Sequence, residues 1–277
     1  MFRYFLALFV FVLSTQTFSE ESDSLHQKSP KVLVLIIASD DQKVYFELQK
    51  VWRAYMNSDP EHFEVYFIRG NPELSSPYAI RGNDLFVKSE ENYVPGIVNK
   101  TILSMEALLP RLSEFDYVLR TNLSSFYSFS RLLDFIKTLP TENCYCGSHL
   151  HIPGEWIPQF GLTHFVSGAG ILISSDLAKM LVREKESIFA LNTGLPDDVL
   201  LGYFFQNWGV PIINAQRVDI PTWEHWEMLQ DNIQDTSFHF RAKQTYHPRT
   251  AEDSWEDEVH INHELLKLFY PSLSMIN

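Results

Sequence analysis

Two adjacent carboxylates, Asp197 and Asp198, are the residues of this chain best suited to acid–base chemistry. They lie in "LPDDVLLGYFFQNWG" (195–209), where Pro196 and the two acids are typical of the first turn of a helix and Gly209 of its end. Acids in that turn often only complement the helix dipole. Alternatively, one of them is a general base whose pKa is adjusted by burial and by the neighbouring carboxylate. Spacing alone favours the first interpretation.

A second segment, "YVLRTNLSSF" (117–126), is notable for the acids that it lacks. It has the pattern of a buried strand that ends in a turn, and the turn contains Asn122, Leu123 and Ser124. Neutral amide and hydroxyl oxygens are poor ligands for Mn²⁺ or Mg²⁺, which prefer charged oxygens. The sequence therefore argues against either ion as a cofactor held by this turn.

The first half of the chain alternates between apolar runs and segments with helical spacing. Strands are expected at 31–39, 63–70, 83–88 and 117–121, and helices after Asp40, from Pro95 and over 128–139. The first two helices are expected to bury Val44, Leu48, Val51, Trp52 and Tyr55, and Val98, Ile102, Met105, Leu109 and Leu112. Such alternation predicts an α/β fold with a parallel, doubly wound sheet.

The second half adds a glycine-containing strand, "HFVSGAGILISS" (164–175), a helix near Asp176, the helix within 195–209 and a tryptophan-rich loop at 221–228. In open α/β sheets, ligands bind beyond the carboxyl ends of the strands. That rule points to 38–41 and 121–125. Glycines at 168 and 170 mark a place where a backbone or a ligand approaches closely.

Composition limits the class of protein. The 277 residues are 45% hydrophobic and 14% aromatic, which is enough for a sizeable core. The formal net charge is −13, and no basic stripe is present that could neutralise phosphates. The sequence therefore predicts no nucleic-acid partner.

The N-terminus forms two separate regions. Residues 1–19 combine Arg3, the apolar run "YFLALFVFVL" (4–13) and small residues near Ser19, which is the pattern of a secretory signal. The uncharged stretch 4–19 is a little shorter than the roughly 20 residues of a bilayer span, so a cleaved signal and an uncleaved membrane anchor both stay open. Residues 20–30 are polar and are expected to be a linker to a domain at 31–277.

Several other residues have both a functional and a structural interpretation. Cys144 and Cys146 are too close in sequence for an unstrained bridge and are expected in the core. Trp156, Trp223 and Trp226 either stack against sugars or close an edge of the core. Two pairs have metal-ligand spacing, but among ten histidines we expect them to be structural: His149 with His151, and His260 with His263.

Five segments, in this order along the chain, resemble the β-1,3-glycosyltransferase superfamily, which includes the Fringe and β-1,3-galactosyltransferase types. They are "EENYVPGIVNKTILSMEAL" (90–108), "FDYVLRTNLSSF" (115–126), "FVSGAGILISSD" (165–176), "LPDDVLLG" (195–202) and "FHF" (238–240). The resemblance covers most of 31–243. One segment departs from the family, because Asn122, Leu123 and Ser124 stand where the family has an acidic metal-binding triplet.

The resemblance implies a GT-A-like single domain, with a mixed, mostly parallel sheet flanked by helices. It also implies an inverting transfer of a hexose or N-acetylhexosamine from a nucleotide sugar, usually a UDP-sugar. By position, Asp198 would take a proton from the acceptor hydroxyl and Asp197 would orient or support it. The donor would contact Ala38, Ser39, Asp40, Arg120, Thr121, Asn122, Ser124, Gly168, Gly170, His239, Arg241 and Lys243.

Without the acidic triplet, three alternatives are open for the diphosphate. Arg120, Arg241 and Lys243 hold it in place of an ion, which is the favoured hypothesis because guanidinium groups bind phosphate bidentately. In the second alternative, His239 and the phosphates hold a metal ion weakly. In the third alternative, the protein binds its ligand and no longer catalyses transfer.

The favoured function is therefore a glycosyltransferase that acts on a glycan or glycoprotein. The alternative is an inactive glycan-binding or scaffolding protein with the same fold, and a histidine-based metal hydrolase is remote. Nucleotide sugars are supplied to the secretory lumen, so the expected location is the Golgi or ER lumen, or outside the cell. Anchoring through 4–19 would attach the protein to a membrane.

Overall fold

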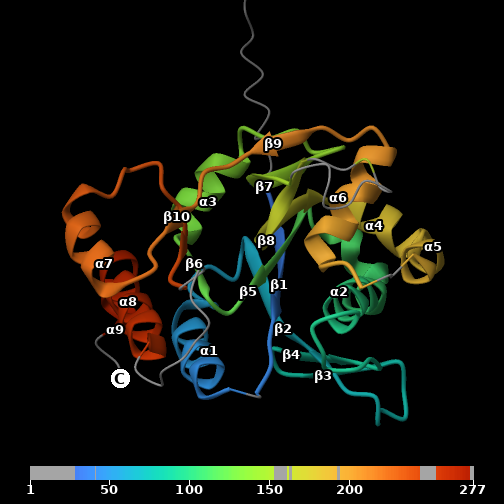
Figure 1. The fold of residues 1–277 in the computed structure, drawn as a ribbon, viewed down its shortest axis with the longest axis horizontal. Helices are drawn as coiled ribbons and strands as arrows, with labels where there is room; N and C mark the ends of the chain where they lie inside the picture. The colour runs from blue at the N-terminus through green and yellow to red at the C-terminus, as the bar shows by residue number, and fades with distance from the viewer. Residues whose placement is uncertain are drawn as a thin grey trace, which may run out of the picture.

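Figure 1 shows the fold in a computed structural model, which describes residues 29–40, 42–152, 161, 164–191, 194–243 and 254–274. Within these residues, an eight-stranded sheet has the order β3-β4-β2-β1-β5-β8-β7-β9. Its strands are β1 (Val32–Ile37), β2 (Phe63–Gly70), β3 (Tyr78–Arg81), β4 (Asp84–Val87), β5 (Tyr117–Asn122), β7 (Tyr145–His151), β8 (His164–Ser174) and β9 (Ile212–Asn214). A smaller sheet, in the order β10-β11-β6, contains β10 (Val218–Asp219), β11 (His239–Arg241) and β6 (Ser125–Tyr127).

The large sheet is mixed and mostly parallel. Strands β4, β2, β1 and β5 are parallel neighbours, and β7 is parallel to β9. Strand β8 runs antiparallel to both β5 and β7, and β3 runs antiparallel to β4. The predicted mixed sheet is confirmed, whereas the purely parallel sheet suggested by strand–helix alternation is wrong at β3 and β8, because each runs antiparallel to the strands with which it pairs.

Helices cover both faces of this sheet. They are α1 (Lys43–Tyr55), α2 (Gly96–Ala107), α3 (Phe129–Ile136), α4 (Ser175–Arg183), α5 (Lys185–Ala190), α6 (Asp197–Asn207), α7 (Trp223–Leu229), α8 (Ser254–Phe269) and α9 (Pro271–Ser274), with 3₁₀ turns at Leu109–Glu114 and Gln230–Asn232. Alternate residues of β1 face opposite layers, as the period of a strand requires. Val32, Val34 and Ile36 pack with α1, α3 and α8, whereas Leu33 and Leu35 pack with α2, α4 and α6 (Figure 1).

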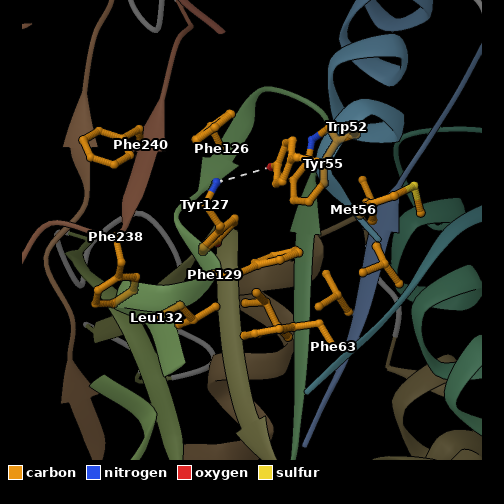
Figure 2. Close-up of a cluster of buried hydrophobic side chains, with 14 of the residues drawn as sticks. Trp52, Tyr55, Met56, Phe63, Phe126, Tyr127, Phe129, Leu132, Phe238 and Phe240 are labelled. Atoms are coloured by element: carbon orange, nitrogen blue, oxygen red, sulfur yellow. Dashed lines mark hydrogen bonds between the residues drawn. The ribbon is translucent and has the colours of Figure 1, made fainter. Parts of the chain in front are cut away.

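An aromatic cluster fixes the segment that follows β5 (Figure 2). Tyr55 of α1 packs against Phe126, with ring centroids 4.7 Å apart, and its hydroxyl accepts a hydrogen bond of 3.4 Å from the backbone N–H of Tyr127. Trp52 Nε1 donates to the carbonyl of Leu123 at 3.2 Å. The turn at 122–125 is therefore held by buried side chains of α1.

Most predicted elements are present with small shifts in their ends. All five predicted core positions of α1 are buried. In α2 the helix ends at Ala107, and Leu109 is 40% exposed, because Pro110 lies in a separate 3₁₀ turn. The edge strand β3 was not predicted. The prediction of a tryptophan-rich loop at 221–228 is wrong in part, because Trp223–Leu229 is a helix. Thr222 caps this helix, and its side chain accepts a hydrogen bond from the N–H of His225.

The cysteine prediction is confirmed. Cys144 and Cys146 are free and buried, and burial raises the pKa of each thiol to about 12. The predicted signal or anchor at 1–19, and the linker up to residue 28, lie outside the described residues. Among the described residues, no helix has the length and apolarity that a membrane span requires.

Candidate active site

The carboxyl ends of β1 and β5 lie side by side, which brings together most of the residues expected to form the site. In the parallel register of these strands Ile37 is opposite Asn122, and in the antiparallel register of β5 and β8 Thr121 is opposite Gly170. The residues after β1, the turn after β5 and the glycines of β8 therefore meet at one edge of the sheet.

A closed ring of contacts joins Arg120 to both aspartates of α6. The guanidinium of Arg120 forms an ion pair with Asp197 and donates a hydrogen bond to the carbonyl of Gly168. The N–H of Gly168 donates to Oδ2 of Asp198 at 2.8 Å. Arg120 and Asp197 are only 3% and 6% exposed, whereas Asp198 is half-buried. Asp198 is thus the carboxylate of the pair that a ligand can reach.

The glycine at 168 is required by this ring. A Cβ at that position would lie 2.8 Å from Nη1 of Arg120 and 3.1 Å from Oδ2 of Asp198. On the other side, Pro196 is extended (φ −55°, ψ 146°) and precedes α6, so the helix begins at Asp197 itself. The prediction that Pro196 occupies the first helical position is therefore off by one residue.

Burial sets the charge behaviour of Asp197. Burial raises the pKa of this carboxyl group, the nearby charge of Arg120 lowers it, and that of Asp198 raises it again, with a net rise above the usual value. A buried carboxylate with one arginine partner fits a residue that orients its neighbour. The burial and pairing of Arg120 do not fit the predicted direct contact of this residue with a diphosphate.

Arg241 of β11 lies in the same region and differs from Arg120 in its partners. Its Nε is buried, and no group among the described residues accepts a hydrogen bond from it, which is also true of Nε of Arg120; Arg120, however, has its ion pair with Asp197 and its bond to Gly168. Burial lowers the pKa of Arg241, the charge of Arg217 lowers it further, and the carboxylates of Asp219, Glu258 and Asp198 raise it. Arg241 is therefore within electrostatic reach of the candidate base, and nothing in the described chain is bonded to its Nε.

His239, also on β11, is part of the packing. The residue is 4% exposed, its ring stacks on that of Tyr127 at a centroid distance of 4.3 Å, and Nε2 lies 3.3 Å from the hydroxyl of Ser125. Burial, together with the charges of Arg217 and Arg241, lowers its pKa well below the usual value. The imidazole is neutral and enclosed, which does not fit the predicted contact with a donor or a metal.

The turn after β5 does not fit a divalent metal. Ser124 and Ser125 both donate hydrogen bonds to Oδ1 of Asn122, at 3.0 and 3.1 Å, so the lone pairs of this amide oxygen are engaged. Thr121 donates to the carbonyl of Ala169 at 2.6 Å. In the described part of the chain, no group of three histidine, cysteine, aspartate or glutamate side chains is arranged to hold an ion.

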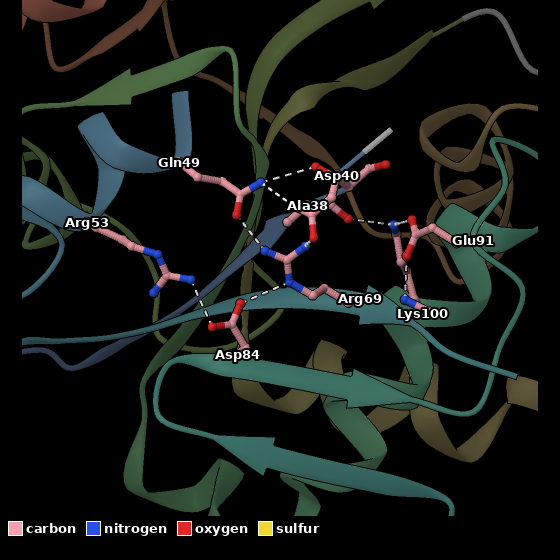
Figure 3. A network of polar contacts seen from close by, with 10 residues as sticks. Ala38, Asp40, Gln49, Arg53, Arg69, Asp84, Glu91 and Lys100 are labelled. Carbon is pink, nitrogen blue, oxygen red and sulfur yellow. Dashed lines mark hydrogen bonds and ion pairs between the residues drawn. The ribbon is translucent and has the colours of Figure 1, made fainter. Parts of the chain in front are cut away.

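A polar network surrounds the end of β1 (Figure 3). Ala38 is fully buried, and its carbonyl accepts a hydrogen bond of 3.1 Å from Nζ of Lys100, which also forms an ion pair with Glu91. The carbonyl of Ser39 accepts from Nε2 of Gln49 at 3.1 Å. Of the three residues expected near the nucleotide, Ala38 is buried, Ser39 is half-buried and Asp40 is exposed.

Lys100 connects this network to the aspartate ring. Burial lowers the pKa of Lys100, Glu91 raises it, and the charges of Arg120 and Arg69 lower it, so the lysine is within electrostatic reach of both arginines. The segment that resembles the family, 90–108, contains Glu91 and Lys100, so it carried the signal for this pair. Gln49 and Arg69 had no such signal, because nothing in their spacing separates them from ordinary helix and strand residues.

Lys243 and Arg217 complete the cationic surroundings. Ala242 donates a backbone hydrogen bond of 3.2 Å to the carbonyl of Ser124, which places Lys243 beside the turn after β5. Arg217 was not predicted. It donates to Ser167 at 2.7 Å and forms an ion pair with Asp219 at 2.8 Å.

The remaining aromatic and histidine candidates are distributed elsewhere. Trp156 lies outside the described residues. Trp226 is 3% exposed in the core, and Trp223 stacks on His260 at 4.1 Å, so packing accounts for both tryptophans. His149 lies 2.8 Å from a nitrogen of His164, across the β7–β8 pair.

Comparison with known proteins gives a likeness in structure and none in sequence. No protein-family model matches the sequence. No curated protein matches it either. Among solved structures, the fold is similar to the crystal structure of a glycosyltransferase involved in the glycosylation of the major capsid of PBCV-1, with a TM-score of 0.49 and 10% sequence identity, over 84% of this chain and 99% of that one. At that level the likeness defines no activity.

Proposed function

We propose that this protein is an inverting glycosyltransferase that uses a nucleotide sugar, a UDP-sugar in particular, and needs no metal ion. The donor is a hexose or N-acetylhexosamine linked to a diphosphate, and the acceptor is a hydroxyl of a glycan or glycoprotein. The proposal combines the resemblance to the β-1,3-glycosyltransferase superfamily with the geometry around Asp198.

The observation that carries the proposal is the state of Arg241. A buried polar group without a hydrogen-bond partner is costly, and such groups usually mark a site that a ligand completes. Arg241 offers buried Nε with no described acceptor, and its charge interacts with that of Asp198. A phosphate oxygen supplies the charged acceptor that Nε of Arg241 lacks among the described residues.

In the proposed reaction, Asp198 accepts the proton of the acceptor hydroxyl as its oxygen bonds to the anomeric carbon. The bond between that carbon and the diphosphate oxygen breaks on the opposite face, so the configuration is inverted. The electron pair stays on the leaving nucleoside diphosphate, where Arg241 stabilises the added negative charge. Asp197, Arg120 and Gly168 hold Asp198 in place throughout.

Thermal unfolding with UDP tests the donor site. A ligand that binds only the folded state raises the melting temperature. We expect UDP to stabilise the protein equally with Mn²⁺ and with a chelator. Replacement Asp198→Asn should abolish transfer and leave that stabilisation intact. Absence of any protection by UDP would eliminate the proposed donor, and equal loss of transfer and UDP binding in Asp198→Asn would contradict its role as a base.

A binding protein without turnover is the second candidate. The missing acids of the turn, where Asn122 accepts from two serines, favour it. The two candidates differ in one measurement, since only the enzyme releases UDP from a UDP-sugar in the presence of an acceptor. We further propose that the protein acts in the secretory pathway, where nucleotide sugars are supplied, and that 1–19 directs it there.

A further inference from the structure

Three exposed histidines lie together at the end of the β7–β8 pair where His151 is opposite His164. The ring of His164 is 4.9 Å from that of His151 and 4.8 Å from that of His149, measured between centroids. Nε2 of His149 is 2.8 Å from Nδ1 of His164. Spacing along the chain paired His149 with His151, but the direct contact between ring nitrogens is the one with His164.

The backbone of the two strands holds this contact in place. His149 is opposite Val166, and His164 lies two residues before Val166, so the two histidines are diagonal neighbours across the strand pair. The N–H of His149 also donates a hydrogen bond of 3.2 Å to Oδ1 of Asn214 on β9. The two imidazoles are therefore brought together by the sheet and do not depend on a loop for their position.

The distance between the two nitrogens suits a shared metal ion. In a neutral pair one ring donates its N–H to the other, and when each ring carries its proton on the remaining nitrogen, both lone pairs are free for one ion. Two nitrogens about 2.0 Å from an ion lie about 2.8 Å apart at a right angle and about 3.3 Å apart at a tetrahedral angle. Because both side chains are exposed, their rings can turn toward one ion without displacing core residues.

We propose that His149 and His164 bind one transition-metal ion of the Zn²⁺, Ni²⁺ or Cu²⁺ class through Nε2 and Nδ1. Imidazole suits these ions, whereas Mg²⁺ and Mn²⁺ prefer oxygen ligands. Within the described ranges, no three histidine, cysteine, aspartate or glutamate side chains are arranged around an ion, so two imidazoles and water form the site. The proposed sugar transfer needs no ion, and this site is independent of it.

An ion in this place would tie β7 to β8 beyond a bulge. The register of the two strands shifts between Gly147 and His149, which leaves extra residues on β8, Gly168 among them. The N–H of Gly168 donates to Asp198. The ion therefore stabilises the end of the strand pair that carries the bulge, and it contacts neither the base nor the donor.

Calorimetric titration of the full chain with Zn²⁺ alone, and separately with Ni²⁺, tests the proposal. We expect one saturable site per chain. Loss of a group that supports a metal ligand weakens binding by about 10- to 100-fold, so loss of a ligand should cost at least tenfold in His149→Gln and in His164→Gln. The matched controls are His151→Gln and His260→Gln, because both remove an exposed histidine and leave the two nitrogens of the pair in place.

Weaker binding in the two pair variants, with unchanged affinity in the controls, supports the site. Absence of saturable binding by the unmodified protein overturns it, since the two rings would then only share a hydrogen bond. A loss in either control as large as in the pair variants also overturns it, because the ion would then bind surface histidines in general. UDP affinity in a chelator should be the same in His149→Gln as in the unmodified protein, so failure of the metal site leaves the glycosyltransferase proposal standing.

Discussion

Arg120 and Arg241 both lie near the aspartates of α6 and differ in their bonds: Arg120 is paired with Asp197, and Arg241 interacts electrostatically with Asp198. Arg120, on β5 of the large sheet, is bonded to Asp197 and to the carbonyl of Gly168. The buried Nε of Arg241, on β11 of the small sheet, has no acceptor among the described residues, and neither has that of Arg120, so the difference lies in the bonds that the rest of the Arg120 guanidinium makes. The bonds of Arg120 fix the shape of the site, and Arg241 is available to a ligand. Position in sequence predicted the same role for both.

The difference follows from where each strand lies. Strand β5 is in the middle of the large sheet, so a charge on it must be compensated by the protein itself. Strand β11 is the middle strand of the three-stranded sheet, and its Arg241 is opposite Ser125 and half-buried, whereas Arg120 is 3% exposed.

The largest effect is expected from Arg120→Met. Removing one partner of a buried ion pair leaves the other charge uncompensated, which costs about 3–5 kcal/mol. Urea unfolding should show that loss in the free energy of unfolding. The double variant Arg120→Met with Asp197→Leu should recover most of it. A loss in the free energy of unfolding below about 1 kcal/mol in the single variant would mean that Asp197 does not depend on Arg120 to compensate its charge.

Gly168→Ala should have the next largest effect. The added methyl group would lie against Nη1 of Arg120 and Oδ2 of Asp198, so one of them must move. Overpacking of this kind costs about 1–3 kcal/mol. Transfer should fall more than UDP binding does, because Arg241 is not displaced. If stability and transfer are both unchanged, the ring around Asp198 is looser than described.

Arg241→Met should affect the ligand-free protein in the opposite sense to Arg120→Met. Removing a charge whose Nε has no partner should leave the free energy of unfolding unchanged or raise it, by about 1 kcal/mol or less. Urea unfolding of both variants side by side gives the comparison. Similar large losses in the free energy of unfolding of the two variants would contradict the difference described between Arg120 and Arg241.

The smallest effect concerns pH. His239 is buried and neutral, and its pKa is lowered well below 6.5. As pH falls through about 6.5, the unfolded chain takes up a proton that the folded protein does not, so stability falls by at most about 1.4 kcal/mol per pH unit from this residue. Unfolding measured between pH 7.5 and 5.5 should therefore have a smaller slope in His239→Gln. An unchanged slope would show that His239 titrates normally.

Much of the fold was predictable from the sequence because strand and helix periodicity is local. The apolar faces of α1 and the position of β5 follow directly from residue spacing. The antiparallel direction of β8 was not predictable in this way, since direction depends on which strand it pairs with. The exposure of Leu109 and the helix at Trp223–Leu229 depend on local capping, which apolar pattern alone does not describe.

The site was predictable in its parts and not in its connections. Order along the chain placed Asp198, Gly168 and Arg241 in one region. It could not show that Arg120 pairs with Asp197, because the ion pair depends on side-chain direction across two elements. The roles of Gln49, Arg69 and Arg217 also depend on contacts between distant segments, so spacing along the chain held no information about them.

In the proposed function, Arg241 binds the diphosphate of a donor that needs no metal ion. The direct test of this claim is the affinity of UDP, measured by calorimetry in a chelator, for the unmodified protein and for Arg241→Met. A charge-assisted hydrogen bond to phosphate predicts saturable binding that weakens about tenfold or more in the variant. Equal affinities in the two proteins, or binding that requires Mn²⁺, would contradict the account.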